Sequence, residues 1–280
     1  MTRRFIVEGV ACLALLLCAG TALGTPTPQE KCDKARITAW KTYVSCVDTV
    51  VARDVGCLLV GCTIADFDQS GAFAKCRHTY FKNWTNFQMN TALATTTCQP
   101  AGGFQFVDNG DGTVTDNLST LQWERKDGTV GGGASGTDQD NVNNTYQWSA
   151  SGTAADGAAF TTFLPYVDGG EPSPSCLGGQ CDWRLPTLAE LQSIVNDFTC
   201  TGAFGGLKCF CGLIPCVLFE NSTMQADYYW SATSHARDPS YAWVVYFGLN
   251  PSVYLTRQGG FVGVGYKTDG HYVRAVRGGL

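Results

Sequence analysis

The stretch Asp182-Trp183-Arg184-Leu185-Pro186-Thr187-Leu188-Ala189-Glu190-Leu191 decides the fold of the second part of the chain. Thr187 and Glu190 have the spacing of a capping box, in which each side chain accepts a hydrogen bond from a backbone N–H at the start of a helix. The apolar residues that follow recur at helical spacing and form one inward stripe: Leu188, Leu191, Val195 and Phe198. We therefore expect a helix that begins after Thr187 and ends near Asp197.

The residues around this helix predict short strands. Apolar or β-branched residues are concentrated in these segments: Leu121–Glu124, Tyr229–Ala232, Ala242–Phe247, the surroundings of Val253–Thr256, and Tyr272–Arg277. Residues 156–167 predict a short helix. The segment from Lys126 to Thr145 is rich in Gly, Asn and Asp and predicts a mobile surface loop. Two helices and several short antiparallel strands indicate an α+β domain over 104–280.

Residues 104–116 predict a β-hairpin, because apolar residues alternate on both sides of an Asn-Gly-Asp-Gly turn. A calcium loop is the alternative for the same acidic residues. Such a loop needs an oxygen ligand at its third position and a glutamate at its twelfth. Counted from Asp108, these positions are occupied by Gly110 and Ser119. We therefore predict a plain turn and no metal site.

Residues 25–98 predict an α-helical hairpin with helices over 28–53 and 70–97, joined by the segment from Gly56 to Asp68. Thr27 and Glu30 form a second capping box with Pro28 at the first helical position. Each helix carries one apolar stripe, which we interpret as core: Ile37, Trp40, Val44, Val47 and Val51 in the first, and Phe73, Tyr80, Trp84, Phe87, Thr91 and Ala94 in the second. Residues 99–103 form the predicted linker.

Residues 1–24 have the three parts of a secretory signal peptide. Two arginines precede an apolar run from Ile6 to Leu17, and Ala22 and Gly24 supply small residues for a cleavage site. The run is shorter than the about 20 residues that span a bilayer. We therefore predict export, with a mature protein that is periplasmic, on the cell surface or extracellular and has no membrane span.

An exported chain with an even number of cysteines predicts a disulfide framework. Of the 14 cysteines, Cys12 and Cys18 fall in the signal peptide. The others form two groups: Cys32, Cys46, Cys57, Cys62, Cys76 and Cys98, then Cys176, Cys181, Cys200, Cys209, Cys211 and Cys216. Antiparallel helices favour nested pairing in the first group, as Cys32–Cys98, Cys46–Cys76 and Cys57–Cys62. In the second group we expect Cys176–Cys181, and either Cys200–Cys209 with Cys211–Cys216 or the crossed alternative.

Six sequence blocks, in this order, resemble the Lcl C-terminal domain family, a former domain of unknown function named after a bacterial collagen-like adhesin. They are Phe106–Asn117, Leu121–Trp123, Asp182–Leu191, Tyr229–Thr233, Ala242–Val245 and Tyr272–Gly278. The resemblance covers about residues 104–279 and implies a C-type-lectin-like fold, related to formylglycine-generating-type domains. It also implies binding of sulfated polysaccharides. The Gly-X-Y repeat of those adhesins is absent from this sequence, so the resemblance does not extend to collagen-driven trimerisation.

The side chains that stand out most in these blocks are predicted to be structural. They are Trp183, Arg184, Trp230, Arg274 and Arg277. An arginine presents five N–H donors in a planar fork, which suits backbone carbonyls and carboxylates in a core. We expect the tryptophans to be buried and the arginines to organise a hydrogen-bond network around them.

Candidate ligand-binding residues lie between Ser234 and His271, where aromatic and cationic side chains alternate. They are His235, Arg237, Tyr241, Tyr254, Arg257, Lys267 and His271. Aromatic faces stack on sugars, and cations bind sulfate or carboxylate groups. Residues 235–280 carry five basic and two acidic side chains in a chain with a net charge of −5. We therefore expect a positively charged face there.

Two functions of different classes fit these observations. The first is a non-catalytic recognition or adhesion module that binds a glycan or a sulfated polysaccharide. The second is a structural or assembly component of the cell envelope that binds a protein partner through the helical hairpin. An enzyme of the formylglycine-generating type is a remote third, because it would need a free, reactive thiol. The sequence contains neither G-x-S-x-G nor H-E-x-x-H, so we predict no enzyme and no cofactor. The acidic net charge argues against a nucleic-acid partner.

The cysteine count predicts a mature protein without free thiols. Thiol titration of the denatured, unreduced protein is expected to give essentially no reactive groups, because all twelve remaining cysteines pair. One or two reactive thiols per chain would contradict this prediction and favour the enzyme hypothesis.

Overall fold

The structure, a computed structural model, describes residues 26, 28–59, 72–73, 75–80, 82–83, 106–170, 173, 175–195, 224–248 and 260–279. The predicted signal peptide, the linker 99–103 and the cysteines from Cys200 to Cys216 lie outside these residues. The longer elements are α1 (Pro28–Leu59), β1 (Phe106–Asp108), β2 (Thr113–Asp116), β3 (Leu121–Glu124), β4 (Tyr146–Gln147), α3 (Leu164–Val167), α4 (Leu188–Ser193), β5 (Tyr228–Ser234), β6 (Tyr241–Tyr246), β7 (Phe261–Tyr266), β8 (Gly270–His271) and β9 (Val276–Gly278). A π-helical turn, Ala159–Phe163, precedes α3, and a 3₁₀ turn covers Leu177–Gly179. The predicted α+β class is confirmed.

The strands form three antiparallel sheets. Their strand orders are β1-β2-β3-β9, β4-β8 and β5-β6-β7. The predicted hairpin is confirmed by the pairing of β1 with β2, in which Asp108 lies opposite Val114. In its turn Asp108 accepts a hydrogen bond from the N–H of Gly110, and Asp111 accepts one from the N–H of Thr113. The acidic side chains therefore close the turn itself, as Asp and Asn commonly do.

Strand β7 was not among the predicted strands. Its sequence, Phe-Val-Gly-Val-Gly-Tyr, alternates, but two glycines are unfavourable in a strand. The register explains Gly265, because a Cβ there would lie 2.7 Å from His271 Nε2 and 2.8 Å from a ring carbon of Trp230. Glycine is required because the rings of other elements pack directly against the backbone of β7. The predicted strand around Val253–Thr256 lies outside the described residues.

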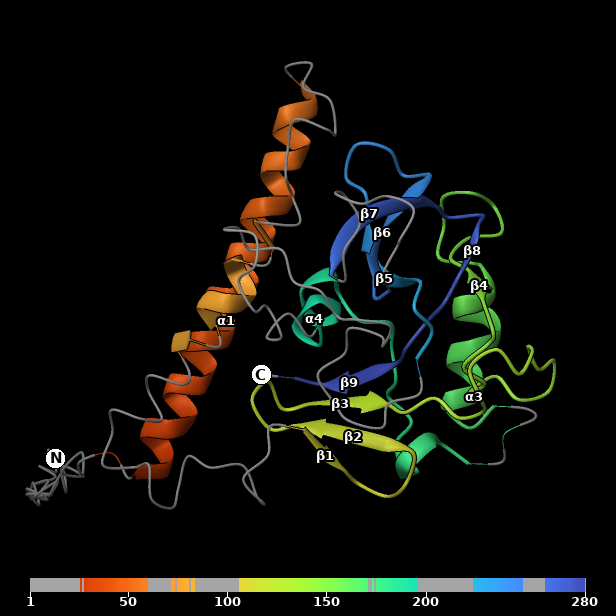
Figure 1. Ribbon diagram of the computed structural model, residues 1–280, viewed down its shortest axis with the longest axis horizontal. Coiled ribbons are helices and arrows are strands. Elements are labelled where there is room, and N and C mark those ends of the chain that lie inside the picture. Colours follow the sequence, from red (N-terminus) through yellow and green to blue (C-terminus); the bar gives the residue numbers. More distant parts are fainter. Residues whose placement is uncertain are drawn as a thin grey trace, which may run out of the picture.

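Helix α4 begins after Thr187, as predicted, and both halves of the capping box are present. It ends at Ser193, four residues before the predicted end, and all six of its residues are buried. The predicted inward residues Leu188, Leu191 and Val195 are buried in one core cluster, and the other residues of α4 are buried as well. Helix α4 lies between α1 on one side and β5 and β6 on the other, so that no side of it faces water (Figure 1).

Helix α1 begins at Pro28, as predicted, but continues to Leu59 instead of ending at residue 53. Its buried stripe also differs from the predicted one: Cys32, Trp40, Tyr43, Val47 and Val50. Residues 75–80 are helical and lie against it, and the ring centroids of Tyr43 and Tyr80 are 5.0 Å apart. The rest of the predicted hairpin lies outside the described residues. None of the described helices combines the length and the apolar character that a bilayer crossing needs.

Two predicted disulfides are confirmed. Cys46–Cys76 joins α1 to the helical residues 75–80, and Cys176–Cys181 closes the loop before Trp183. Cys32 is also in a disulfide. Its predicted partner Cys98, like the predicted pair Cys57–Cys62, has no side chain among those the structure describes.

The N-terminal helix and the second part of the chain share one hydrophobic core. Trp40, Tyr43 and Val47 of α1 belong to the same buried cluster as Leu191 of α4 and Trp243 of β6. Polar contacts support the packing: the Tyr43 hydroxyl donates to the carbonyl of Ala189 at 2.8 Å, Arg36 to the carbonyl of Asn117 at 3.2 Å, and Arg77 to the amide oxygen of Gln192. The apolar stripe of α1 is therefore buried against the second part of the chain as well as against residues 75–80.

The loop from Lys126 to Thr145 is exposed over residues 127–134, as its composition predicted. Its second half is partly embedded, because Val142 and Asn144 are buried and Asp127 forms a β-bridge with Asn141. Its side-chain amides hydrogen-bond the loop backbone: Asn143 Nδ2 donates to the carbonyl of Thr129 at 2.9 Å and Asn144 Nδ2 to that of Asp138 at 2.8 Å. The Asn and Asp residues that suggested mobility hold the loop in one conformation.

Replacing Tyr43 by Phe removes one buried hydrogen bond between α1 and α4 without changing the packed ring. We expect a loss of about 1 kcal/mol in the free energy of unfolding, measured by chemical denaturation. Thr49→Ala is the matched control, because the exposed Thr49 hydroxyl donates only within its own helix. A Tyr43→Phe protein as stable as the parent would mean that α1 does not dock on α4 through this contact.

Candidate functional site

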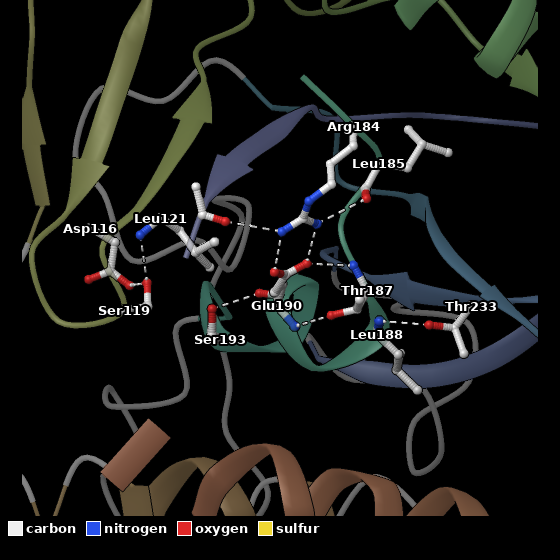
Figure 2. A network of polar contacts seen from close by, with 11 residues as sticks. Asp116, Ser119, Leu121, Arg184, Leu185, Thr187, Leu188, Glu190, Ser193 and Thr233 are labelled. Carbon is white, nitrogen blue, oxygen red and sulfur yellow. Dashed lines mark hydrogen bonds and ion pairs between the residues drawn. The ribbon is translucent and has the colours of Figure 1, made fainter. Parts of the chain in front are cut away.

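Arg184 and Glu190 form the centre of the network around α4 (Figure 2). The guanidinium donates two hydrogen bonds to the two carboxylate oxygens, at 2.7 and 2.6 Å, and a further one to the carbonyl of Gly278 at 3.3 Å. Glu190 also accepts the N–H of Thr187 at 2.8 Å. The hydrogen bonds to Glu190 raise the pKa of Arg184 above its usual value. The pair thus joins the segment before α4, the start of α4 and the end of β9, which is a structural role.

The other conspicuous residues of the matching blocks are structural too, as predicted. The indole N–H of Trp183 donates to the carbonyl of Leu177 at 3.1 Å, and that of Trp230 donates to the carbonyl of Tyr146 at 2.8 Å. Arg277 donates to Asp182 at 2.5 Å and to Gln122 at 2.7 Å. Arg274 is fully buried. These contacts join β3, β9 and the segment before α4 into one frame.

A group of ring and apolar side chains lies at the end of the β5-β6-β7 sheet, in which Val264 and Tyr266 are exposed, Tyr241 is half-buried and His235 is buried. We call it the aromatic surface and define it by His235, Tyr241, Val264 and Tyr266. Tyr241 and Tyr266 lie opposite each other in the register of β6 and β7, with ring centroids 4.2 Å apart. Tyr266 is 54% and Val264 36% exposed. The His235 ring lies 6.5 Å from that of Tyr241.

Alternation along β7 explains why these residues reach solvent. Val262, Val264 and Tyr266 point to the same face of the sheet, because side chains two apart in a strand do so. Val262 is buried in the core cluster that contains α4. Helix α4 packs on β5 and β6, and its Gln192 side chain donates to the carbonyl of Gly260 just before β7, whereas Val264 and Tyr266 further along β7 are exposed.

The polar groups of the aromatic surface are bound to each other. A hydrogen bond with the Tyr266 hydroxyl raises the pKa of Tyr241 to about 12, so the Tyr241 hydroxyl is neutral at physiological pH. In the turn before β6, Asp238 accepts hydrogen bonds from the Ser240 hydroxyl at 2.5 Å and backbone N–H at 3.0 Å, which lower the pKa of that carboxyl. The N–H of Asp238 donates to His235 Nδ1 at 3.3 Å. The rings thus stand on a pre-formed turn, next to hydroxyl and carboxylate acceptors.

The sequence-predicted ligand residues do not form one site. His235 and Tyr241 lie together on the aromatic surface. His271 lies on the opposite face of the sheet, where its ring is 4.6 Å from that of Trp230 and burial lowers its pKa. Arg237 is exposed in the turn. Tyr254 and Arg257 lie outside the described residues.

Lys267 was expected to be an exposed cation, and this expectation is wrong. The residue is 1% exposed, and its ammonium lies 3.8 Å from the centroid of the Trp148 ring. It donates to the carbonyl of Thr153 at 2.8 Å and to the Ser234 hydroxyl. Because Lys267 follows Tyr266 in the strand, it points to the opposite face, where it joins β7 to the loop after β4.

The expected positive face is not formed by the described residues. The structure describes four of the five cations of residues 235–280. Lys267 and Arg274 are buried, and Arg277 is paired with Asp182. Arg237 is exposed, but Asp238 and Asp269 are exposed as well. The net charge of residues 235–280 predicted a positive face wrongly, because burial and ion pairing keep most of these cations from contributing charge to the surface.

Two residues of the aromatic surface, Val264 and Tyr266, were missed in the sequence. The available signal was the alternation along Phe261–Tyr266. Val262, Val264 and Tyr266 lie on one face of the strand, and Gly263 and Gly265 lie on the other. Metal ligation has no support in the described part of the chain, where no three His, Cys, Asp or Glu side chains are grouped to hold an ion.

Lys267→Ser and Arg237→Ser test the two cations separately. We expect Lys267→Ser to lower the free energy of unfolding by about 1–3 kcal/mol, because the acceptors on Thr153 and Ser234 lose the buried ammonium that donates to them. Arg237→Ser, the matched exposed replacement, should change it by less than about 0.5 kcal/mol. Chemical denaturation of both variants measures this, and equal stability would mean that Lys267 is at the surface.

Comparison with known proteins adds one match. The model of the Lcl C-terminal domain matches residues 112–277, more than half of the chain. No curated protein matches the sequence significantly. No solved structure matches significantly either. The match begins at the β1–β2 turn and ends in β9, so it spans the frame of Arg184, Glu190 and Arg277 and the whole aromatic surface. The chain belongs to the Lcl C-terminal domain family.

Proposed function

We propose that this protein is a non-catalytic recognition module that binds an extracellular glycan through the aromatic surface. The observation that carries the proposal is the close, tilted pair of Tyr241 and Tyr266 next to exposed Val264. Sugar rings present C–H groups that pack on aromatic faces, and tyrosine combines such a face with a hydroxyl that hydrogen-bonds. Tyr has few rotatable bonds, so little conformational entropy is lost when a ligand binds.

An uncharged sugar fits this surface better than a sulfated one. The carboxylates of Asp238 and Asp269 act electrostatically on Tyr241 and are exposed, as is Arg237 beside Asp238 in the chain, so these charges do not sum to a positive patch. Carboxylates and hydroxyls are suitable acceptors for sugar hydroxyl groups, while carboxylates repel sulfate. The sulfated-polysaccharide binding that the sequence suggested is therefore the less favoured form of the proposal.

The proposal includes a C-type-lectin-like fold and export to the envelope or beyond it. Support for the fold comes from the short antiparallel strands with Trp183 and Trp230 buried between them. Support for export comes from the disulfides Cys46–Cys76 and Cys176–Cys181, because such bonds persist in oxidising compartments. The complete helical hairpin of 25–98 stays part of the proposal.

The alternative, an assembly component that binds a protein partner through the hairpin, has less support. A docking helix usually offers an apolar stripe to its partner. Trp40, Tyr43 and Val47 of α1 are already buried in the protein's own core. The face of α1 that stays exposed is mostly polar and includes Lys34, Lys41 and Asp48.

The test is a glycan array with the mature protein, followed by titration of the best ligand. Tyr266→Ser is expected to weaken binding by about 1–2 kcal/mol, which is about a five- to thirty-fold rise in Kd, because one stacking face is lost. Val130→Ser is the control, since Val130 is 50% exposed in a different loop. Thermal melting of both variants should match the parent. A Tyr266→Ser protein that binds as the parent does would contradict the proposed surface.

A further inference from the structure

Lys126 lies in a buried cluster with two carboxyl groups that the aromatic surface does not use. Its ammonium nitrogen is 2.5 Å from Glu124 Oε1 and 3.9 Å from Asp140 Oδ1. The side chains of Lys126 and Glu124 are 3% and 0% exposed, and that of Asp140 is 16% exposed. The ring of Phe163 covers the nitrogen, with its centroid 4.0 Å away. A primary amine is thus held beside two carboxyl groups in an apolar enclosure.

The polar atoms of the cluster are poorly satisfied. Lys126 Nζ, Glu124 Oε1 and Asp140 Oδ1 are each buried without a well-formed hydrogen bond to any residue that the structure describes. Burying a charged group costs several kcal/mol unless it is paired and hydrogen-bonded. The buried ion pair of Lys126 and Glu124 is therefore costly, because it has few hydrogen bonds from the described residues.

The two carboxyl groups differ in environment. Burial, followed by the charge of Glu124 and a hydrogen bond with it, raises the pKa of Asp140 to about 10, so Asp140 is a neutral acid at physiological pH. Glu124 Oε2 accepts the backbone N–H of Ala275 at 2.6 Å, and Glu124 interacts with the fully buried Arg274. A neutral carboxylic acid is an electrophile for an amine, whereas a carboxylate is a base. The chemistry assigns these roles to Asp140 and Glu124 respectively.

We propose that Lys126 and Asp140 are joined by an intramolecular amide bond, with Glu124 as the group that transfers the proton. Glu124 takes a proton from the ammonium, and the amine nitrogen attacks Cγ of Asp140. The C–N bond forms, the C–OH bond breaks, and the hydroxyl leaves as water after receiving a proton from the nitrogen through Glu124. No oxidation or reduction takes place, and one proton passes to solvent for each ammonium consumed.

The geometry and the charge balance both favour this product. The amine nitrogen lies 3.9 Å from Asp140 Oδ1, the oxygen bonded to the Cγ that it attacks. The reaction needs Nζ and Cγ to approach to about 3–3.5 Å. After the reaction the carboxylate of Glu124 and the guanidinium of Arg274 remain, which is one negative and one positive charge. The amide ties the loop from Lys126 to Thr145 covalently to the end of β3.

Intact-mass spectrometry of the reduced full-length mature protein tests the proposal directly. The expected mass is lower than that of the sequence by one water molecule. Tryptic mapping is expected to yield one branched peptide that contains both Lys126 and Asp140, with no cleavage after Lys126. A protein with the full sequence mass and normal cleavage after Lys126 would overturn the proposal, and so would a branch that ends on Glu124.

Three variants assign the roles. Lys126→Arg keeps the charge but cannot form the amide, and Glu124→Gln keeps the shape but cannot take the proton, so both are expected to have the full sequence mass. Lys41→Arg, on the exposed face of α1, is the control and should retain the loss of water. Full conversion in Glu124→Gln would contradict the assigned role of Glu124. The mass and peptide map of the wild-type protein decide whether the amide bond exists. The test therefore remains valid even if a variant fails to fold.

Discussion

The ion pair between Arg184 and Glu190 joins three parts of the chain that are distant in sequence. It links the segment before α4, the first turn of α4 and the carbonyl of Gly278 at the end of β9. The carboxylate of Glu190 also caps the helix, so a single side chain fixes both the start of α4 and its position against the sheet. Two parallel hydrogen bonds give such a pair a defined geometry as well as energy. The burial of α4 on all sides depends on this fixed position.

The position of α4 in turn decides which part of the β5-β6-β7 sheet is exposed. One face is covered by α4, with α1 packed behind it, and the other by a second cluster that contains Trp148 and Trp183. Helix α4 starts beside Thr233 of β5 and ends beside Gly260, and its contacts with the sheet are made to β5 and β6. Val264 and Tyr266 of the neighbouring strand β7 remain exposed.

Local signals predicted much of the frame. The capping box at Thr187, the Asn-Gly-Asp-Gly turn and the disulfides Cys46–Cys76 and Cys176–Cys181 follow from the chemistry of a few neighbouring residues or from spacing along two helices. Of the candidate site, His235 and Tyr241 were predicted and are found side by side. Lys267 and His271 were predicted with them but lie on the other face. A single residue step along a strand reverses the face, and a sequence pattern does not reveal what covers each face.

The sequence by itself determined the class of the domain, its family and the structural role of Arg184, Arg274 and Arg277, because these depend on residue types at fixed spacing. Tertiary structure alone decided which charges are available. It buried Lys267 against Trp148 and enclosed Lys126 with Glu124 and Asp140, in a loop whose composition suggested mobility. It also placed Tyr266 in solvent next to Tyr241. Burial and pairing depend on contacts between residues far apart in the chain, so a count of charges along the sequence could not supply them.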